Sequence, residues 1–174
     1  MTRLGNAFRN FGYEGTTLSL LAKATGLQKA SLYHRFPGGK EQMAREVLES
    51  AQSWIEDQVL RPLRSSGDPA SKVAAMAEKI DEFYSGGRQA CLLNMLSSGR
   101  NLDGPFATEI KGMFQVWVTA LSAVAVDAGV DKKVARTRAE RFVALLQGSL
   151  VLSRGLGTLQ PFRDFLKSAP GELL

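Results

Sequence analysis

Residues 17–36 read TLSLLAKATGLQKASLYHRF, and the pattern of apolar residues in this stretch is the strongest indication of the fold. Leu21 belongs to an apolar stripe of helical spacing before Gly26, and Leu32 and Phe36 lie one turn apart in a second helical segment after it. Glycine tolerates the positive φ that a tight turn between two helices requires. Two short helices joined by such a turn form a helix-turn-helix, so the stretch predicts this motif.

The second of these segments is rich in polar side chains. They could be the solvated face of an ordinary helical hairpin, or donors held out together toward an anion. Their types suit phosphate oxygens and the edges of bases in the major groove, which favours double-stranded DNA as the partner. The side chains are those of Gln28, Lys29, Ser31, Tyr33, His34 and Arg35.

Helical spacing of apolar residues continues along the rest of the chain. We expect further helices over residues 4–11, 40–62, 69–84, 91–96, 105–128 and 132–154. No segment shows sustained alternation of apolar and polar residues, so we expect no sheet. The predicted fold class is therefore all-α. An N-terminal three-helix helix-turn-helix domain, residues 1–41, is joined by a long fourth helix to a C-terminal helical bundle within residues 42–174.

Apolar residues around the motif predict its core. Leu27 and Leu32 are expected to pack against Leu18 and Leu21. Pro62 should close the long fourth helix, because proline lacks the N–H that a helix interior needs. The face of the first helix that we expect to be buried consists of Leu4, Ala7, Phe8 and Phe11.

Two long helices carry apolar residues on more than one side. Over residues 105–128, Val116, Ala120 and Ala123 form a second apolar face, and residues 142–152 are apolar almost all round. A helix of this kind is buried on more than one side. In a chain of 174 residues this predicts a partner subunit, and we expect a homodimer formed as a four-helix bundle by the last two long helices.

The formal net charge of the chain is +5, which favours polyanionic partners. The first 50 residues hold seven Lys and Arg against four Asp and Glu, a balance of +3. A single cysteine and a single histidine allow neither an internal disulfide nor a soft-ligand metal site, and no cofactor is expected. Because no apolar run has the length of a signal peptide or a membrane span, we expect a cytoplasmic protein without membrane contact.

Two segments look superficially like enzyme motifs. Residues 155–160, GLGTLQ, have glutamine where the dinucleotide fingerprint needs its third glycine. The segment PGGKE lacks the earlier glycine and the Ser or Thr of a phosphate-binding loop. A catalytic pair of Cys91 and His34 would need a histidine that belongs to the helix-turn-helix. We therefore expect no enzymatic activity.

Residues 11–43, FGYEGTTLSLLAKATGLQKASLYHRFPGGKEQM, resemble the tetracycline-repressor (TetR) family of bacterial transcription regulators over a long, ordered stretch. The segments FPGGKEQ, ACLLNMLSSG and ALLQGSLVLSR are similar to the LmrA-like subgroup. The resemblance implies a ligand-responsive transcription regulator. Its expected form is a homodimeric repressor that a small-molecule effector releases from a pseudo-palindromic operator.

The resemblance also implies roles for single residues. Thr17 would cap the second helix and touch a phosphate. Lys40 would hold the DNA backbone from the amino end of the fourth helix, where the helix dipole favours an anion. Tyr33 and His34 would contact the phosphate backbone as well. The residues implied to face base edges in the major groove are Gln28, Lys29, Ala30 and Ser31.

A set of apolar side chains, most of them aromatic or methionine, is first of all a predicted core. It is also the candidate lining of an effector pocket. The family implies that such a pocket controls DNA affinity, and this lining indicates an apolar or aromatic small molecule. The candidate residues are Trp54, Phe83, Tyr84, Cys91, Met95, Met113, Phe114 and Trp117.

The amino-terminal region departs from the family pattern. Ten residues precede Phe11, whereas family members usually have a longer first helix preceded by a basic arm. Either the arm is missing or the natural start lies upstream. This departure keeps a second function open: a small-molecule-binding or scaffold protein whose helix-turn-helix no longer binds DNA.

Overall fold

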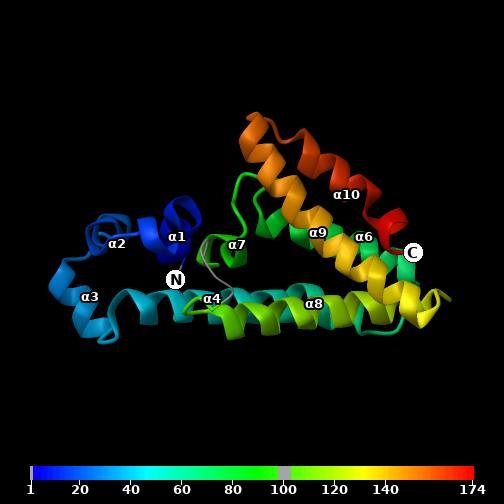
Figure 1. Cartoon of the computed structure of the whole chain (residues 1–174), viewed down its shortest axis with the longest axis horizontal. Coiled ribbons are helices and arrows are strands. Elements are labelled where there is room, and N and C mark those ends of the chain that lie inside the picture. The colour runs from blue at the N-terminus through cyan, green and yellow to red at the C-terminus, as the bar shows by residue number, and fades with distance from the viewer. Residues whose placement is uncertain (1, 98–102) are drawn as a thin grey trace. The chain divides into compact units, whose positions relative to one another are not determined.

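The computed structural model of the chain describes residues 2–97 and 103–174, and the secondary structure of these residues is entirely helical (Figure 1). The all-α prediction is therefore confirmed for this part of the chain. The helices group into two compact units. Unit 1 consists of Met1–Ser53 and Ala90–Ile110, and unit 2 of Trp54–Gln89 and Lys111–Leu174. The domain boundary between residues 41 and 42 stays a prediction.

Unit 1 begins with α1 (Thr2–Gly15), which is kinked at Gly12, where φ is 67° and ψ 179°. Phe8 is fully buried as predicted, but Phe11 is 50% exposed, which corrects the expectation that it lies inside. Phe11 directly precedes Gly12, where the backbone leaves helical geometry, and the fully buried Thr16 donates its hydroxyl to the Gly12 carbonyl at 2.5 Å. The predicted inward stripe therefore ends at Phe8.

The helix-turn-helix consists of α2 (Leu18–Thr25) and α3 (Lys29–Arg35). Gly26 caps the end of α2 in the left-handed conformation, with φ 75° and ψ 13°, as the sequence predicts. Leu32 is fully buried, but Leu27 is 46% exposed, so its predicted burial is wrong. Leu27 directly follows the reversal of the chain at Gly26 and lies outside both helices, so the helical periodicity does not place its side chain.

A long helical run follows α3. α4 (Gly39–Ile55) passes into a π-helical segment, η1 (Glu56–Leu60), and then into α5 (Arg61–Leu63). The run ends just beyond Pro62 rather than before it. Pro62 lies just after the π-helical segment, and only one further residue of helix follows it, so the missing N–H lies at the end of the run.

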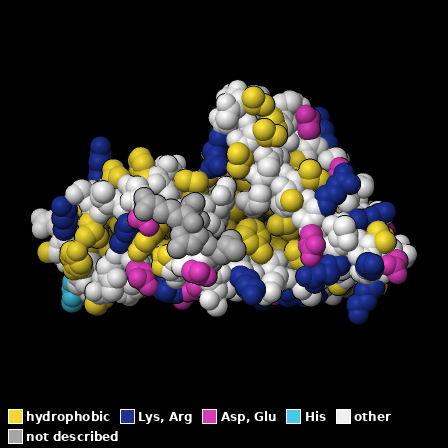
Figure 2. All heavy atoms as spheres, in the orientation of Figure 1, with side chains coloured by type: hydrophobic (Ala, Val, Ile, Leu, Met, Phe, Trp, Pro, Cys, Tyr) yellow, Lys and Arg dark blue, Asp and Glu magenta, His cyan; other side chains and the backbone are white. Residues whose placement is uncertain are grey.

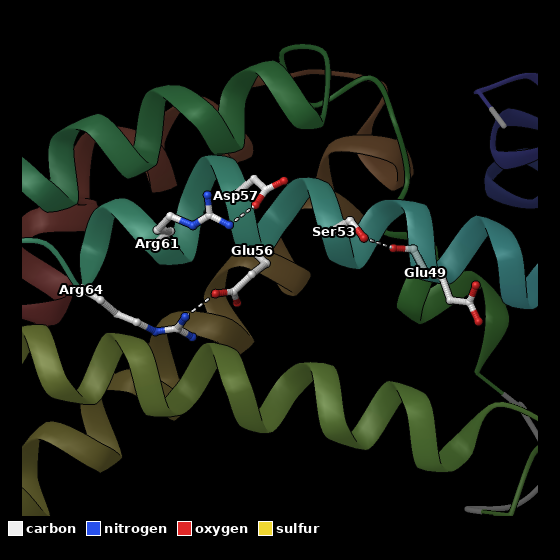
Figure 3. Close-up of polar contacts among 6 residues, drawn as sticks. All are labelled: Glu49, Ser53, Glu56, Asp57, Arg61 and Arg64. Carbon is white, nitrogen blue, oxygen red and sulfur yellow. Dashed lines mark hydrogen bonds and ion pairs between the residues drawn. The ribbon is translucent and has the colours of Figure 1, made fainter.

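Two ion pairs brace the π-helical segment (Figure 3). The Arg61 guanidinium lies 2.5 Å from a carboxylate oxygen of Asp57, four residues earlier. Arg64 forms the second pair, with Glu56. All four side chains are partly exposed, so each pair adds little to the free energy of unfolding.

Unit 1 is completed by α7 (Leu92–Leu96) and by the start of α8 (Ala107–Asp127), whose later residues belong to unit 2. α7 packs against α1. The approach is close at Gly12, because a Cβ added there would lie 3.2 Å from the Met95 carbonyl oxygen. The first helix is thus held by residues that follow it by about eighty positions in the chain.

Unit 2 also contains α6 (Pro69–Phe83), α9 (Lys132–Leu156) and α10 (Gln160–Leu173). α10 runs back along α9 and also contacts α6 (Figure 1). No helix is predicted from the sequence after residue 154, and α10 corrects this. Two prolines and a glycine obscure its signal, yet a stripe of helical spacing is buried. It consists of Phe162, Phe165, Ala169 and Leu173.

Candidate nucleic-acid interface

The short helix α3 buries one side and exposes the other. Only Leu32 and, just past the helix, Phe36 are buried here. Figure 2 shows the histidine side chain at the surface over α3. The exposed residues include all those predicted to meet base edges or phosphates from this segment, and Arg35 with them. They are Gln28, Lys29, Ala30, Ser31, Tyr33, His34 and Arg35.

Thr17 stands at the start of α2 and is exposed. Its hydroxyl oxygen accepts a hydrogen bond from the Leu20 amide at 3.2 Å, which is the capping role expected of it. A threonine hydroxyl can accept and donate at once. The Thr17 proton is therefore left to donate to a phosphate oxygen.

Lys40 differs from the other predicted phosphate ligands because it is half-buried and engaged within the protein. Its ammonium donates to the Tyr13 carbonyl at 2.9 Å. The same ammonium lies 4.2 Å from the centre of the Tyr13 ring, a cation–π distance. Lys40 therefore joins the start of α4 to the end of α1, and a phosphate would have to compete with this contact.

The Tyr13 phenol remains neutral near physiological pH. Burial raises its pKa most, and the carboxylates of Glu41 and Glu14 raise it further, while the Arg45 guanidinium lowers it. The attraction between Lys40 and the Tyr13 ring is therefore that of a cation for a neutral aromatic face.

A hollow of about 480 Å³ beside the helix-turn-helix adds Thr2, Arg3 and Thr25, which sequence reasoning does not select. Arg3 reaches across it to the end of α2, where its guanidinium donates to the Thr25 carbonyl at 3.1 Å. Arg35 pairs with Glu46 at 3.5 Å and keeps a side chain that is 64% exposed. The lining residues are Thr2, Arg3, Leu4, Thr25, Leu27, Leu32, Arg35 and Phe36.

The predicted effector-pocket residues fall into both units. Cys91 and Met95 belong to unit 1, and the other six to unit 2. Within unit 2, the rings of Trp54 and Phe83 lie 4.9 Å apart, and the Tyr84 ring meets that of Phe83 edge-on at 5.1 Å. The structure therefore joins three of the predicted side chains into one aromatic cluster.

Phe162 of α10 extends the aromatic cluster, with its ring 6.0 Å from that of Tyr84. It is missing from the predicted set because α10 itself is not predicted. Met113 and Trp117 are buried in α8, and Phe114 between them is half-buried.

One polar atom inside unit 2 has no hydrogen-bond partner among the described residues. It is the side-chain oxygen Oε1 of Gln147, on α9, and it is shielded from solvent. Native proteins rarely leave a buried acceptor unpaired, because the loss of its hydrogen bond to water costs free energy. Gln147 is therefore a candidate for a hydrogen bond to a ligand. The residues around it in the sequence do not indicate this role.

Two kinds of feature are absent from the described residues. Residues 2–97 and 103–174 contain no cluster of three or more His, Cys, Asp or Glu side chains suited to a metal ion. No helix in these ranges combines the length and apolarity that crossing a membrane requires.

α2 and α3 are joined by a turn at Gly26, follow the kinked helix α1, and α3 exposes a polar surface. These features define a helix-turn-helix DNA-binding protein. A model of bacterial regulatory proteins of the tetR family matches residues 6–47. A model of the C-terminal domain of LmrA/YxaF-like transcriptional regulators matches residues 69–168. The chain belongs to the TetR family, within its LmrA/YxaF-like group.

Individual proteins agree with this assignment. The HTH-type transcriptional regulator LmrA of Bacillus subtilis (strain 168) is 25% identical over 149 residues, which are 84% of this chain and 79% of that protein. A TetR transcriptional regulator from Legionella pneumophila has a TM-score of 0.82 at 21% identity, covering 99% of this chain and 95% of that one. AibR, solved with isovaleryl coenzyme A and operator DNA, has a TM-score of 0.62 at 23% identity over 84% of each chain. The two structures share the fold.

Proposed function

We propose that this transcription regulator is a homodimeric repressor, without enzymatic activity, that acts in the cytoplasm and is released from a pseudo-palindromic operator by a small apolar or aromatic effector. The observation that carries the DNA-binding part is the outward face of α3. Six hydrogen-bonding side chains and an alanine are exposed there, while Leu32 and Phe36 anchor the helix from inside. Gln28, Lys29, Ala30 and Ser31 are the residues proposed to read bases.

Phosphate contacts are proposed for the edges of this face. Thr17, Tyr33 and His34 are exposed, and each can donate to a phosphate oxygen. Lys40 is proposed to join them by exchanging its contact with Tyr13 for one with DNA. Arg3 and Arg35 are added to the set because both flank the hollow next to α3.

Dimerisation is supported by an exposed apolar face on α9. Leu145, Val151, Leu152 and Leu156 are 37%, 45%, 55% and 67% exposed. Gly148 and Gly155 lie on the same side, and nothing approaches within 4 Å of where their Cβ atoms would be. Other residues of α9 pack on α10, so this face is free for a second copy. Because α10 lies beside α9, we infer that these two helices form the bundle, in place of the pair predicted from the sequence.

The effector is proposed to bind within unit 2. The aromatic cluster of Trp54, Phe83, Tyr84 and Phe162 supplies an apolar surface. The unpaired Oε1 of Gln147 accepts hydrogen bonds, so an effector bearing an O–H or N–H group would satisfy it. AibR, which holds isovaleryl coenzyme A and operator DNA together in its structure, supports the idea that this fold carries both sites.

The DNA-binding proposal is tested by selection and titration. Duplexes with a random central region are selected on the purified protein. The sequence recovered, here called the selected duplex, is labelled and titrated by fluorescence anisotropy at several salt concentrations. We expect Kd to be at least about a thousandfold lower for the selected than for a scrambled duplex. Equal, weak binding to both at low salt would overturn the proposal in favour of a small-molecule-binding or scaffold protein.

The dimer is tested by Leu152→Glu, which places a charge on the exposed face of α9. Sedimentation should show a dimer for the parent protein and a monomer for the variant, since a buried unpaired charge is not tolerated in such an interface. Val126→Glu is the matched control, because Val126 is 41% exposed but lies on α8. A Leu152→Glu protein that remains dimeric would refute the proposed interface.

A further inference from the structure

Four side chains of unit 1 form a continuous array. Its centre is the pair of rings of Tyr13 and Phe106, and a cationic side chain, Lys40 or Arg45, contacts each ring. The Lys40 ammonium lies 4.2 Å from the Tyr13 ring centre, and the Tyr13 and Phe106 rings meet edge-on, with centres 4.9 Å apart and planes at 81°. The Arg45 guanidinium completes the array 5.5 Å from the Phe106 ring centre. Each of these contacts is attractive because a cation or a ring edge meets the negative face of a ring.

The array is fixed to the backbone at both ends. Lys40 donates to the Tyr13 carbonyl at 2.9 Å, and Arg45 donates to the Pro105 carbonyl at 3.0 Å. Arg45 also forms an ion pair with Glu109, in the first turn of α8. The end of α1, the start of α4 and the start of α8 are therefore held together by side chains whose partners are specific.

Phe106 gives the array a firm centre. It is fully buried and directly precedes α8, a helix of 21 residues that begins in unit 1 and continues into unit 2. A buried ring packed on another ring moves between discrete positions, since a close-packed interior does not deform continuously. Phe106 therefore gives the first turn of α8 a direct packing contact with Tyr13.

The same part of unit 1 contacts α1 at two other places. The buried Arg9 guanidinium donates to the Ala90 carbonyl at 2.7 Å, and Gly12 packs against Met95. These contacts hold the middle of α1, whereas the array holds its end, next to the start of α2. Of the three contacts to α1, only the array includes a predicted DNA ligand, Lys40.

We propose that Tyr13 and Arg45 are positioning residues, through which the first turn of α8 sets how the helix-turn-helix is presented to DNA. The inference rests on the proposed function, because it assigns the regulatory contact of that same DNA-binding site. An effector that favours another position of α8 acts on this array, and it can do so only by its differential affinity for the two positions.

The contact between Lys40 and Tyr13 predicts different effects on binding to one half-site and to two. The Lys40 ammonium is held by the ring and carbonyl of Tyr13, and DNA competes for it. Loss of the Tyr13 ring removes the cation–π contact and leaves only the backbone carbonyl, so Lys40 is held less firmly and binding to a single half-site should not weaken. Binding to both half-sites at once should weaken, since the two helix-turn-helix units of a dimer are then less well fixed. A general loss of stability would weaken both kinds of binding.

The first experiment measures the Kd of the full-length protein for the selected duplex and for the same duplex with one half-site scrambled. Tyr13→Leu should raise Kd for the intact duplex at least about fivefold and change Kd for the single half-site less than about twofold. Tyr13→Phe keeps the ring, so it should restore the parent ratio of the two values. An equal rise in Kd on both duplexes for Tyr13→Leu, which would leave the ratio of the two values unchanged, would overturn the proposal.

The second experiment removes the other cation and guards against a misfolded Tyr13 variant. Arg45 is partly exposed, so Arg45→Met should fold, and it should change the ratio of the two Kd values as Tyr13→Leu does. Arg61→Met is the matched control, because Arg61 forms an i,i+4 ion pair with Asp57 as Arg45 does with Glu41 (Figure 3). An equal ratio for both arginine variants would refute the role of Arg45. Failure of the proposed function appears differently, as a parent protein that does not distinguish the selected from a scrambled duplex.

Discussion

The two units expose opposite kinds of surface. In unit 1, α3 turns polar side chains outward and keeps only Leu32 and the adjoining Phe36 inside. In unit 2, α9 turns leucine and valine side chains outward, the most exposed being Leu156 at 67% (Figure 2). The polar surface suits a charged partner such as DNA. The apolar surface suits a partner that excludes water, such as a second subunit.

The helices that carry the two surfaces are stabilised in different ways. α3 has seven residues and α2 eight, which is too short for either to be stable alone in water. Their positions depend on a few buried leucines. α9 has 25 residues and a long packed contact with α10, so it can present an apolar face without depending on that face for its own folding.

The largest expected effect comes from Leu32→Ala, which removes the buried anchor of α3. Leu32 is 0% exposed, and truncation of a buried leucine costs about 2–5 kcal/mol of the free energy of unfolding. Urea unfolding followed by circular dichroism should show this loss, together with loss of binding to the selected duplex. Ser31→Ala is the matched control, because the exposed neighbour should change stability by less than about 0.5 kcal/mol. Equal stability of the two variants would contradict the dependence of α3 on its anchor.

The next effect separates sequence reading from attraction to phosphate. Gln28 is exposed at the start of α3, so Gln28→Ala should cost about 1–3 kcal/mol on the selected duplex and change the sequence that selection recovers. Lys40→Ala provides the comparison, since loss of a charge at a proposed phosphate ligand should weaken binding to all sequences alike and reduce the salt dependence of Kd. An equal loss for Gln28→Ala on selected and scrambled duplexes would show that Gln28 reads no base.

Local chemistry predicts the helix-turn-helix well. Gly26 adopts the left-handed turn, Thr17 caps α2, and Leu21 and Leu32 are buried, as the spacing of residues 17–36 indicates. Each of these features depends on neighbours within a few positions, which the sequence displays directly. The exposure of the polar residues of α3 follows from the same periodicity.

Features that depend on distant residues were not predicted. Lys40 meets Tyr13 across 27 positions, and Arg3 meets Thr25 across 22, so no local pattern reveals either contact. The exposure of Phe11 has another origin, since the backbone leaves helical geometry at the next residue, Gly12. Helical periodicity assigns a residue to a side of its helix but does not say what fills the space there.

A smaller effect tests the interior of unit 2. Gln147→Met keeps the size of the side chain and removes the acceptor that has no partner in the described part of the chain. We expect the free energy of unfolding to rise by about 1 kcal/mol or to stay unchanged, because the cost of an unpaired buried oxygen is relieved. Thermal unfolding of both proteins measures this. Gln115→Met, an exposed glutamine of α8, is the control, and a clear destabilisation specific to Gln147→Met would mean that its amide is already satisfied.

The smallest effect concerns the start of α6 and its dependence on pH. Asp68 caps this helix, accepting hydrogen bonds from the Ser71 amide at 2.9 Å and the Ser71 hydroxyl at 2.8 Å. The backbone hydrogen bond lowers the pKa of Asp68 most, and the hydroxyl lowers it further, below the ordinary value of 3.8. A carboxylate whose pKa is lower in the folded than in the unfolded chain stabilises the fold above the unfolded pKa. That contribution is lost as pH falls through the folded pKa.

Asp68→Asn isolates this contribution, because asparagine caps a helix about as well as aspartate but carries no charge to favour the helix start. The parent protein should melt slightly higher than the variant at neutral pH, and the difference should shrink as pH falls from about 5 to about 3. Thermal unfolding of both proteins across this range measures the difference, from which the titration of all other groups cancels. A difference in Tm that stays constant with pH would show that the Asp68 charge contributes nothing. Binding of the selected duplex at neutral pH should be the same for both proteins, because Asp68 belongs to unit 2 and the residues proposed to read DNA belong to unit 1.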